Sequence, residues 1–103
     1  MFEANSRFMT CGIKEQLPTP LLVQLWMSID TQINAGLEMD YLQVFRFEKV
    51  SDLVLAIRHE QEQPERKTVI YCEYRKDYEK LLQKIVYIID DGDHSTVLFL
   101  DEY

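Results

Sequence analysis

A single long helical pattern between Thr19 and Gly36 limits the possible folds more than any other part of the sequence. Thr19 can cap a helix, Pro20 suits its first turn, and Gly36 can end it in the left-handed conformation. The apolar residues between these ends recur at intervals of three or four and form one stripe: Leu22, Leu25, Trp26, Ile29 and Ile33, with Leu21 at the edge. The pattern predicts an amphipathic helix with Val23 and Met27 exposed together on its flank.

Short strand-like segments make up most of the remaining chain. They show either alternating polar and apolar residues or continuous apolar runs. The predicted strands are residues 7–13, 41–48, 53–57, 67–74, 85–90 and 95–100. The segment Leu53–Ile57 also fits a short helix capped by Ser51, but the hairpin-length spacing from Glu48 favours a strand. Asp91-Gly92, between the last two predicted strands, is among the strongest local signals of a β-hairpin.

These elements predict an α+β fold. Consecutive strands joined by short turns favour antiparallel pairing over alternating βαβ units. A second, short helix is expected at residues 75–84, where Tyr78, Leu81 and Leu82 recur at helical spacing. We therefore expect one domain, residues 1–103, with a mainly antiparallel sheet of about five or six strands, one amphipathic helix and a short second helix. Of its residues 47% are hydrophobic and only six are Gly or Pro, which disfavours disorder and long linkers.

The sequence also predicts a cytoplasmic location. No basic segment followed by an apolar run opens the chain, and no stretch approaches the ~20 apolar residues that span a bilayer. Cys11 and Cys72 lack a C-x-x-C spacing, so we expect two reduced thiols that act as small core residues. No membrane partner is expected.

Several short motifs resemble a small bacterial family. They are Asp40–Phe45, His59-x-Gln61-Glu62-x-Pro64-Glu65, Asp90-Asp91-Gly92-Asp93 and the closing Glu102-Tyr103. The family is known only as a domain of unknown function, chiefly from low-GC Gram-positive bacteria, and the resemblance covers almost the whole chain, including the Trp26 helix. It implies a bacterial cytosolic protein and brings no established activity, cofactor or catalytic residue. Arg66 and His94 stand where the family has aromatic residues, so no role is inferred for either.

The net charge of −7 is concentrated at one end of the chain. Residues 85–103 contain five acids and no Lys or Arg, whereas residues 1–84 contain 13 acids and 11 basic residues. Asp90, Asp91 and Asp93 have the oxygen ligands that Mg²⁺ or Ca²⁺ prefers, but the spacing of a calcium-binding loop is missing. We therefore favour a tight turn with solvated acids.

His59 is the second candidate for chemistry. Histidine is a natural general base and metal ligand, and Glu60 and Glu62 lie nearby in sequence. In a strand, however, His59 shares its face with Gln61 and points away from both acids. A site that combines His59 with His94 and an Asp would require the fold to bring them together. A structural or solvent-facing role for His59 is favoured.

The segment from Arg66 to Lys84 is locally basic and interleaves with Tyr71, Tyr74 and Tyr78, a pattern compatible with stacking on single-stranded RNA. A solvated helix face explains the lysines more simply, and the acidic balance makes nucleic acid an unlikely partner.

No motif here outweighs its structural explanation, so no catalytic residue, metal ligand or cofactor site is assigned. The preferred function is a small protein-interaction or regulatory module without catalytic activity, acting on a protein partner or as a homodimer. Its candidate surface residues are Val23, Met27, Tyr71, Asp90, Asp91 and Asp93. The alternatives are an acidic decoy or regulator of a basic, nucleic-acid-binding protein, and a metal-dependent enzyme using His59 or the three aspartates.

Overall fold

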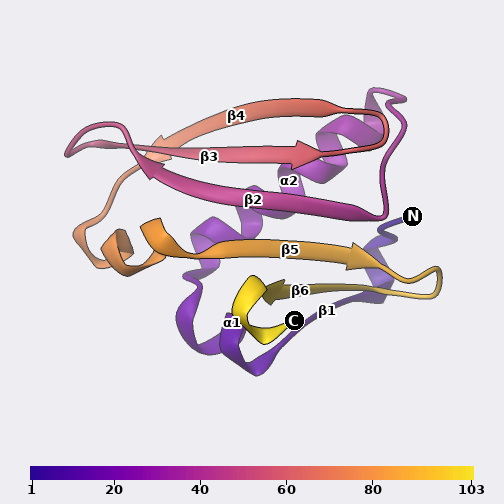
Figure 1. Ribbon diagram of the computed structural model, residues 1–103, viewed down its shortest axis with the longest axis horizontal. Coiled ribbons are helices and arrows are strands. Elements are labelled where there is room, and N and C mark those ends of the chain that lie inside the picture. Colours follow the sequence, from indigo (N-terminus) through magenta and orange to yellow (C-terminus); the bar gives the residue numbers. More distant parts are fainter.

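The predicted strands form one six-stranded sheet in the computed structural model, which describes residues 1–103 (Figure 1). The strands are β1 (Arg7–Met9), β2 (Leu42–Lys49), β3 (Val54–Gln61), β4 (Arg66–Glu73), β5 (Ile85–Asp90) and β6 (Ser95–Phe99). Their order in the sheet is β1-β6-β5-β2-β3-β4. All neighbours are antiparallel except β1 and β6, which pair in parallel. The α+β, mainly antiparallel prediction is confirmed, and Leu53–Ile57 belongs to a strand from Val54 onward.

The helices are α1 (Cys11–Gln16) and α2 (Thr19–Asn34), with short 3-10 segments η1 (Ala4–Ser6), η2 (Lys76–Gln83) and η3 (Leu100–Glu102). The expected second helix is therefore a 3-10 helix. No helix here combines the length and the apolar character of a membrane-spanning segment.

The predicted N-terminal strand ends early. Its last residues belong instead to α1, because the Thr10 side chain accepts a hydrogen bond from the Ile13 amide and caps that helix. Cys11 consequently lies exposed at the start of α1, so its prediction as a core residue was wrong. Phe2, ahead of the strand, is fully buried.

The buried face of α2 differs from the predicted stripe. It is formed by Leu21, Leu25, Ser28, Ile29 and Gln32, while Leu22, Trp26 and Ile33 are only partly buried. The buried face is rotated toward Ser28 and Gln32, because both side chains form hydrogen bonds inside the protein. The spacing of apolar residues alone cannot predict the burial of these two polar residues. The expected cap by Thr19 was also wrong: the helix begins at Thr19, and the Pro18 carbonyl accepts from the Leu21 and Leu22 amides. Gly36 has φ +77° as predicted.

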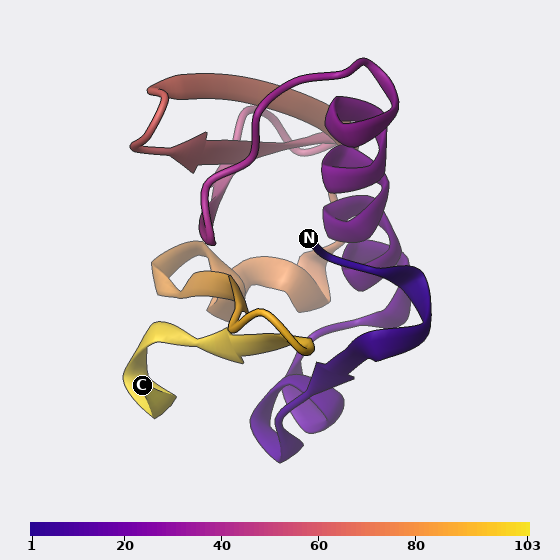
Figure 2. The same ribbon diagram turned by 90° about the vertical axis from the view of Figure 1, so that its right-hand side faces the viewer.

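The core lies between the sheet and α2, and the two views place α2 on one side of the sheet only (Figures 1 and 2). Alternate sheet residues, among them Phe45, Ile57, Val86, Ile88 and Val97, point toward that side and are fully buried. The residues between them point to the opposite side, which we call the open face.

Candidate functional site

A buried polar network joins α2 to the sheet, with His59 at its centre. His59 lies on β3, is 2% exposed, and stacks on the Phe45 ring with 4.3 Å between ring centroids. Its Nδ1 is 2.6 Å from Ser28 Oγ, and its Nε2 is 2.6 Å from Gln43 Oε1. Both ring nitrogens are thus bonded inside the protein.

The partners of Gln43 define the proton positions on His59. The Gln43 amide nitrogen donates to Asp40 O and to Gln61 Oε1, so its oxygen faces the imidazole as an acceptor. His59 therefore donates from Nε2 and accepts from the Ser28 hydroxyl at Nδ1. This is the neutral form of the ring. Burial, reinforced by the positive charge of Arg66, lowers the pKa of His59 to about 4 and keeps it neutral.

The network extends to the loop that follows α2. Gln61 donates to Glu38 O and Pro64 O, and Arg66 donates to Glu38 O at 2.7 Å and to Gln32 Oε1 at 3.0 Å. These bonds satisfy polar groups that would otherwise be buried without partners. They also fix the approach of the loop to β3 and β4.

The Ser28, His59 and Gln43 chain resembles a hydrolytic triad in outline but not in its electrostatics. The third member is a neutral amide, which cannot stabilise an imidazolium as a carboxylate does. A histidine whose pKa is about 4 is also a weak base at neutral pH. The arrangement fits a structural role, in which His59 links α2 to the sheet through its hydrogen bonds to Ser28 and Gln43. A structural role is one of the two that the sequence favoured for His59.

The acidic hairpin does not join His59. His94 forms its contacts with Asp91, at 3.2 Å, and with the Phe8 ring. Asp91 accepts from the Asp93 and His94 amides, and these bonds lower its pKa. No group of three or more His, Cys, Asp or Glu residues is close enough to hold a metal ion.

Asp90 is buried, which corrects its assignment to an exposed surface. Its carboxylate accepts from the Phe2 amide at 2.6 Å and from the Gly92 amide at 2.8 Å. It therefore closes the hairpin turn and ties down the N-terminal segment. Asp91 and Asp93 remain exposed.

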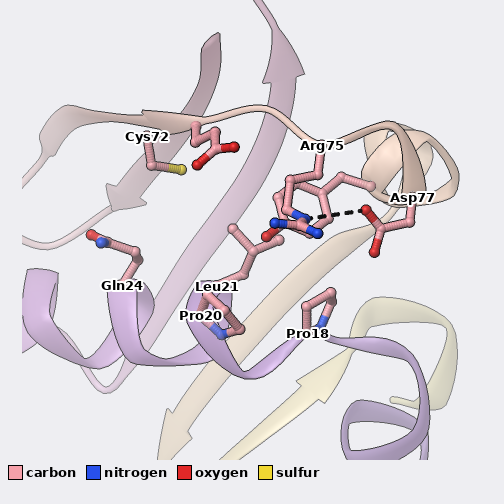
Figure 3. A pocket seen from close by; sticks show the side chains of 9 residues that line it. Pro18, Pro20, Leu21, Gln24, Cys72, Arg75 and Asp77 are labelled. Carbon is pink, nitrogen blue, oxygen red and sulfur yellow. Dashed lines mark ion pairs between the residues drawn. The ribbon is translucent and has the colours of Figure 1, made fainter. Parts of the chain in front are cut away.

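A cavity of about 460 Å³ opens where α2 begins beside the end of β4 (Figure 3). Figure 3 shows Cys72 and Gln24 on one side, Pro18, Pro20 and Leu21 below, and Arg75 with Asp77 on the other side. Arg75 and Asp77 form an ion pair at 3.6 Å. Burial raises the pKa of the Cys72 thiol, which makes it a poor nucleophile. The cavity contains no set of groups that converges on a reacting atom.

The predicted apolar surface residues are exposed. Val23 and Met27 are 47% and 54% exposed on α2, and Tyr71 is 66% exposed on β4. Tyr74 and Tyr78, in contrast, are buried in the core and cannot stack on RNA bases.

The open face carries an apolar patch that sequence reasoning missed. Leu42 of β2 lies opposite Ile89 of β5, and Tyr87 of β5 lies between Val44 of β2 and Leu98 of β6. All five are half-buried. The signal was present in residues 85–89, where every position is apolar and both sheet faces are therefore apolar.

The open-face patch continues at the C-terminus. Tyr103, which is largely exposed, packs edge-on against Tyr87 with 5.9 Å between ring centroids. We define the apolar patch as Leu42, Val44, Tyr87, Ile89, Leu98 and Tyr103.

Comparisons with known proteins agree with this fold and add no activity. No curated protein matches the chain. A solved structure described as the crystal structure of the protein of unknown function from Enterococcus faecalis is similar in fold, with a TM-score of 0.81 and 23% sequence identity. The similarity covers 100% of this chain and 98% of that one. The family model described as staphylococcal protein of unknown function (DUF960) matches residues 6–102, and the chain belongs to that family.

Proposed function

We propose that the chain is a cytoplasmic protein-interaction module that binds a protein partner through the apolar patch on the open face, without catalysing a reaction. The observation that carries this proposal is the one-sided architecture: α2 covers one face of the sheet, and the other face presents contiguous apolar side chains. Contiguous exposed apolar surface on a small domain is a common mark of an interaction site.

The composition of the patch fits a protein partner. Tyr87 and Tyr103 supply large, rigid contact area, and tyrosine is enriched among residues that dominate binding energy. Leu42, Val44 and Ile89 provide a flat aliphatic surface beside them. A second apolar surface laid on this sheet would exclude water from it.

The charges around the patch define the partner further. Asp91 and Asp93 lie in the turn at one end of the β5–β6 hairpin, and Asp101 lies in η3 at the other end. Lys84 neutralises Asp101 at 2.8 Å, but no Lys or Arg occurs within residues 85–103. The partner surface that complements this region is apolar at its centre and basic at its rim.

In the other half of the open face, the charged side chains of β2 and β3 form ion pairs with each other. Arg46 pairs with Glu60, and Arg58 pairs with Glu48, across neighbouring strands. This half offers no net charge, and its exposed apolar side chains, Val69 and Tyr71, lie apart from the patch on the edge strand β4. An acidic decoy that mimics a phosphate backbone is less favoured, because Asp90 is buried and Glu102 is occupied by bonds from Thr10 and the Phe99 amide.

Site-specific photocrosslinking tests the proposal while the partner is still unidentified. Benzoylphenylalanine at position 44 or 98 should crosslink a discrete protein in cells, whereas the same group at Glu15, exposed on α1, should not. Equal crosslinking from Glu15, or no crosslink from the open face, would overturn the proposal.

The captured protein then allows a quantitative test. Val44→Glu and Tyr103→Glu should each weaken binding by about tenfold or more, because each places a charge in an apolar contact. Lys14→Glu, on the exposed side of α1, is the matched control and should bind as the wild type does. Far-UV circular dichroism verifies that each variant is folded. The Tyr103 substitution is less disruptive to folding than the Val44 substitution, since the Tyr103 side chain is largely exposed.

A further inference from the structure

The edge of the sheet at β4 is unpaired over a whole strand. β4 ends the strand order, with β3 as its neighbour on one side and no strand beyond it (Figure 1). It runs over Arg66–Glu73 and contains no Pro, a residue that blunts sheet edges, and its outward charges are one Lys and one Glu. An unpaired edge of this length is a template for pairing with another strand.

The free backbone groups of this edge can be identified from the ladder. Hydrogen-bonded and non-hydrogen-bonded pairs alternate along antiparallel strands. The Tyr74 amide donates to Leu53 O, and these two residues extend the β3–β4 register by one pair beyond Val54 and Glu73. The Leu53–Tyr74 pair is therefore a hydrogen-bonded one. Because bonded pairs alternate, the even-numbered residues of β4 bond to β3. The odd-numbered residues direct their N–H and C=O groups outward: Lys67, Val69, Tyr71 and Glu73.

The same four residues place their side chains on the open face, and all four are exposed. Lys67 and Glu73 have opposite charges and lie equally far from Ile70 in sequence. Neither forms an ion pair within the chain. The edge is therefore self-complementary.

We propose that two copies of the chain pair through their β4 edges, antiparallel, with the two-fold axis at Ile70. Lys67 of each copy then lies opposite Glu73 of the other, and Val69 lies opposite Tyr71. These are the residues whose backbone groups point outward, so each such pair exchanges two hydrogen bonds. Opposite-charge and aromatic–β-branched cross-strand pairs both stabilise a sheet.

Charge selects this register over its neighbours. A two-fold axis at Val69 would place Glu73 opposite Glu65 of the other copy, and an axis at Tyr71 would place Lys67 opposite Arg75. Both arrangements oppose like charges, which destabilises cross-strand pairing. The axis at Ile70 avoids this conflict.

The helix side of the sheet is compatible with the same axis. Ile70 would lie opposite its own copy there, and it lines a groove of about 270 Å³ between α2 and β4 together with Met27. Pairing at β4 would cover this groove and bring the exposed Met27 side chain toward the two-fold axis. The proposal thus gives Met27 and Tyr71 a common role, on opposite sides of one interface.

Charge reversal provides the test, read by analytical ultracentrifugation at high micromolar to millimolar concentration. Lys67→Glu opposes two glutamates in each pair and Glu73→Lys opposes two lysines, so each variant should lose the dimer that the wild type forms. Mixing the two variants restores opposite charges in both pairs, so the mixture should form a heterodimer. Lys76→Glu, an exposed residue of η2 away from the edge, makes the same charge change as Lys67→Glu and should leave the wild-type dimer intact.

Hydrogen exchange gives an independent readout of the edge. The amides of the four odd-numbered residues should become protected as protein concentration rises, whereas the amides of Thr68 and Ile70 should be protected at all concentrations. A monomeric wild type, or two variants that do not recover association when mixed, would overturn the proposal. Its failure would leave the open-face proposal untouched, because the apolar patch lies on β2, β5, β6 and the C-terminus.

Discussion

The neutral state of His59 makes the stability of the fold depend on pH. The folded pKa is about 4 and the unfolded value is 6.5, so between these values the unfolded chain binds a proton that the folded chain does not. Stability is therefore fully present above pH 6.5 and falls as the pH falls toward 4. The maximum loss is about 3 kcal/mol, of which about 2 kcal/mol falls between pH 7 and pH 5.

Urea denaturation followed by circular dichroism measures this loss, with the free energy of unfolding extrapolated to water at each pH. His59→Gln removes the titrating ring and should flatten the dependence between pH 7 and pH 5, where most carboxylates stay ionised. His94→Gln removes the exposed imidazole instead and should keep the wild-type slope. If wild type and His59→Gln had the same slope, the neutral buried histidine would be refuted.

The remaining predictions concern other contacts. Ser28→Ala removes the nearer donor to His59 Nδ1 and leaves only the longer contact with Gln32 Nε2, at 3.3 Å, so it should cost about 1 kcal/mol in the same urea assay, with a shallower pH dependence. Phe2→Ala empties a fully buried site and should cost about 3–4 kcal/mol, whereas Phe8→Ala, at an exposed position, should change stability by less than about 0.5 kcal/mol. Under native conditions a thiol reagent should modify Cys11 quickly and Cys72 slowly, because Cys11 is exposed and burial raises the pKa of Cys72. In urea both thiols should react at similar rates. Equal rates under native conditions would contradict the burial of Cys72.

Only some of the surface residues could be predicted from the sequence. Val23, Met27 and Tyr71 were correctly placed as exposed, because their positions follow from helix and strand periodicity. Asp90 was misplaced, because its burial depends on Phe2, 88 residues away. The apolar patch was missed, because residues 85–89 are apolar on both faces of the strand. Such a strand is equally compatible with a sheet that is covered on both sides.

Residues close together in the sequence specify the secondary-structure elements of this protein. The period of α2, the alternation along β2 and β4, and the Asp91-Gly92 turn are set by neighbours within a few residues, and they were sufficient for the α+β class. Which elements and side chains become neighbours depends instead on tertiary packing. The parallel pairing of β1 with β6, the bonding of His59 to Ser28 and Gln43, and the free edge at β4 join segments far apart in the chain, and their free energies depend on close packing rather than on local spacing.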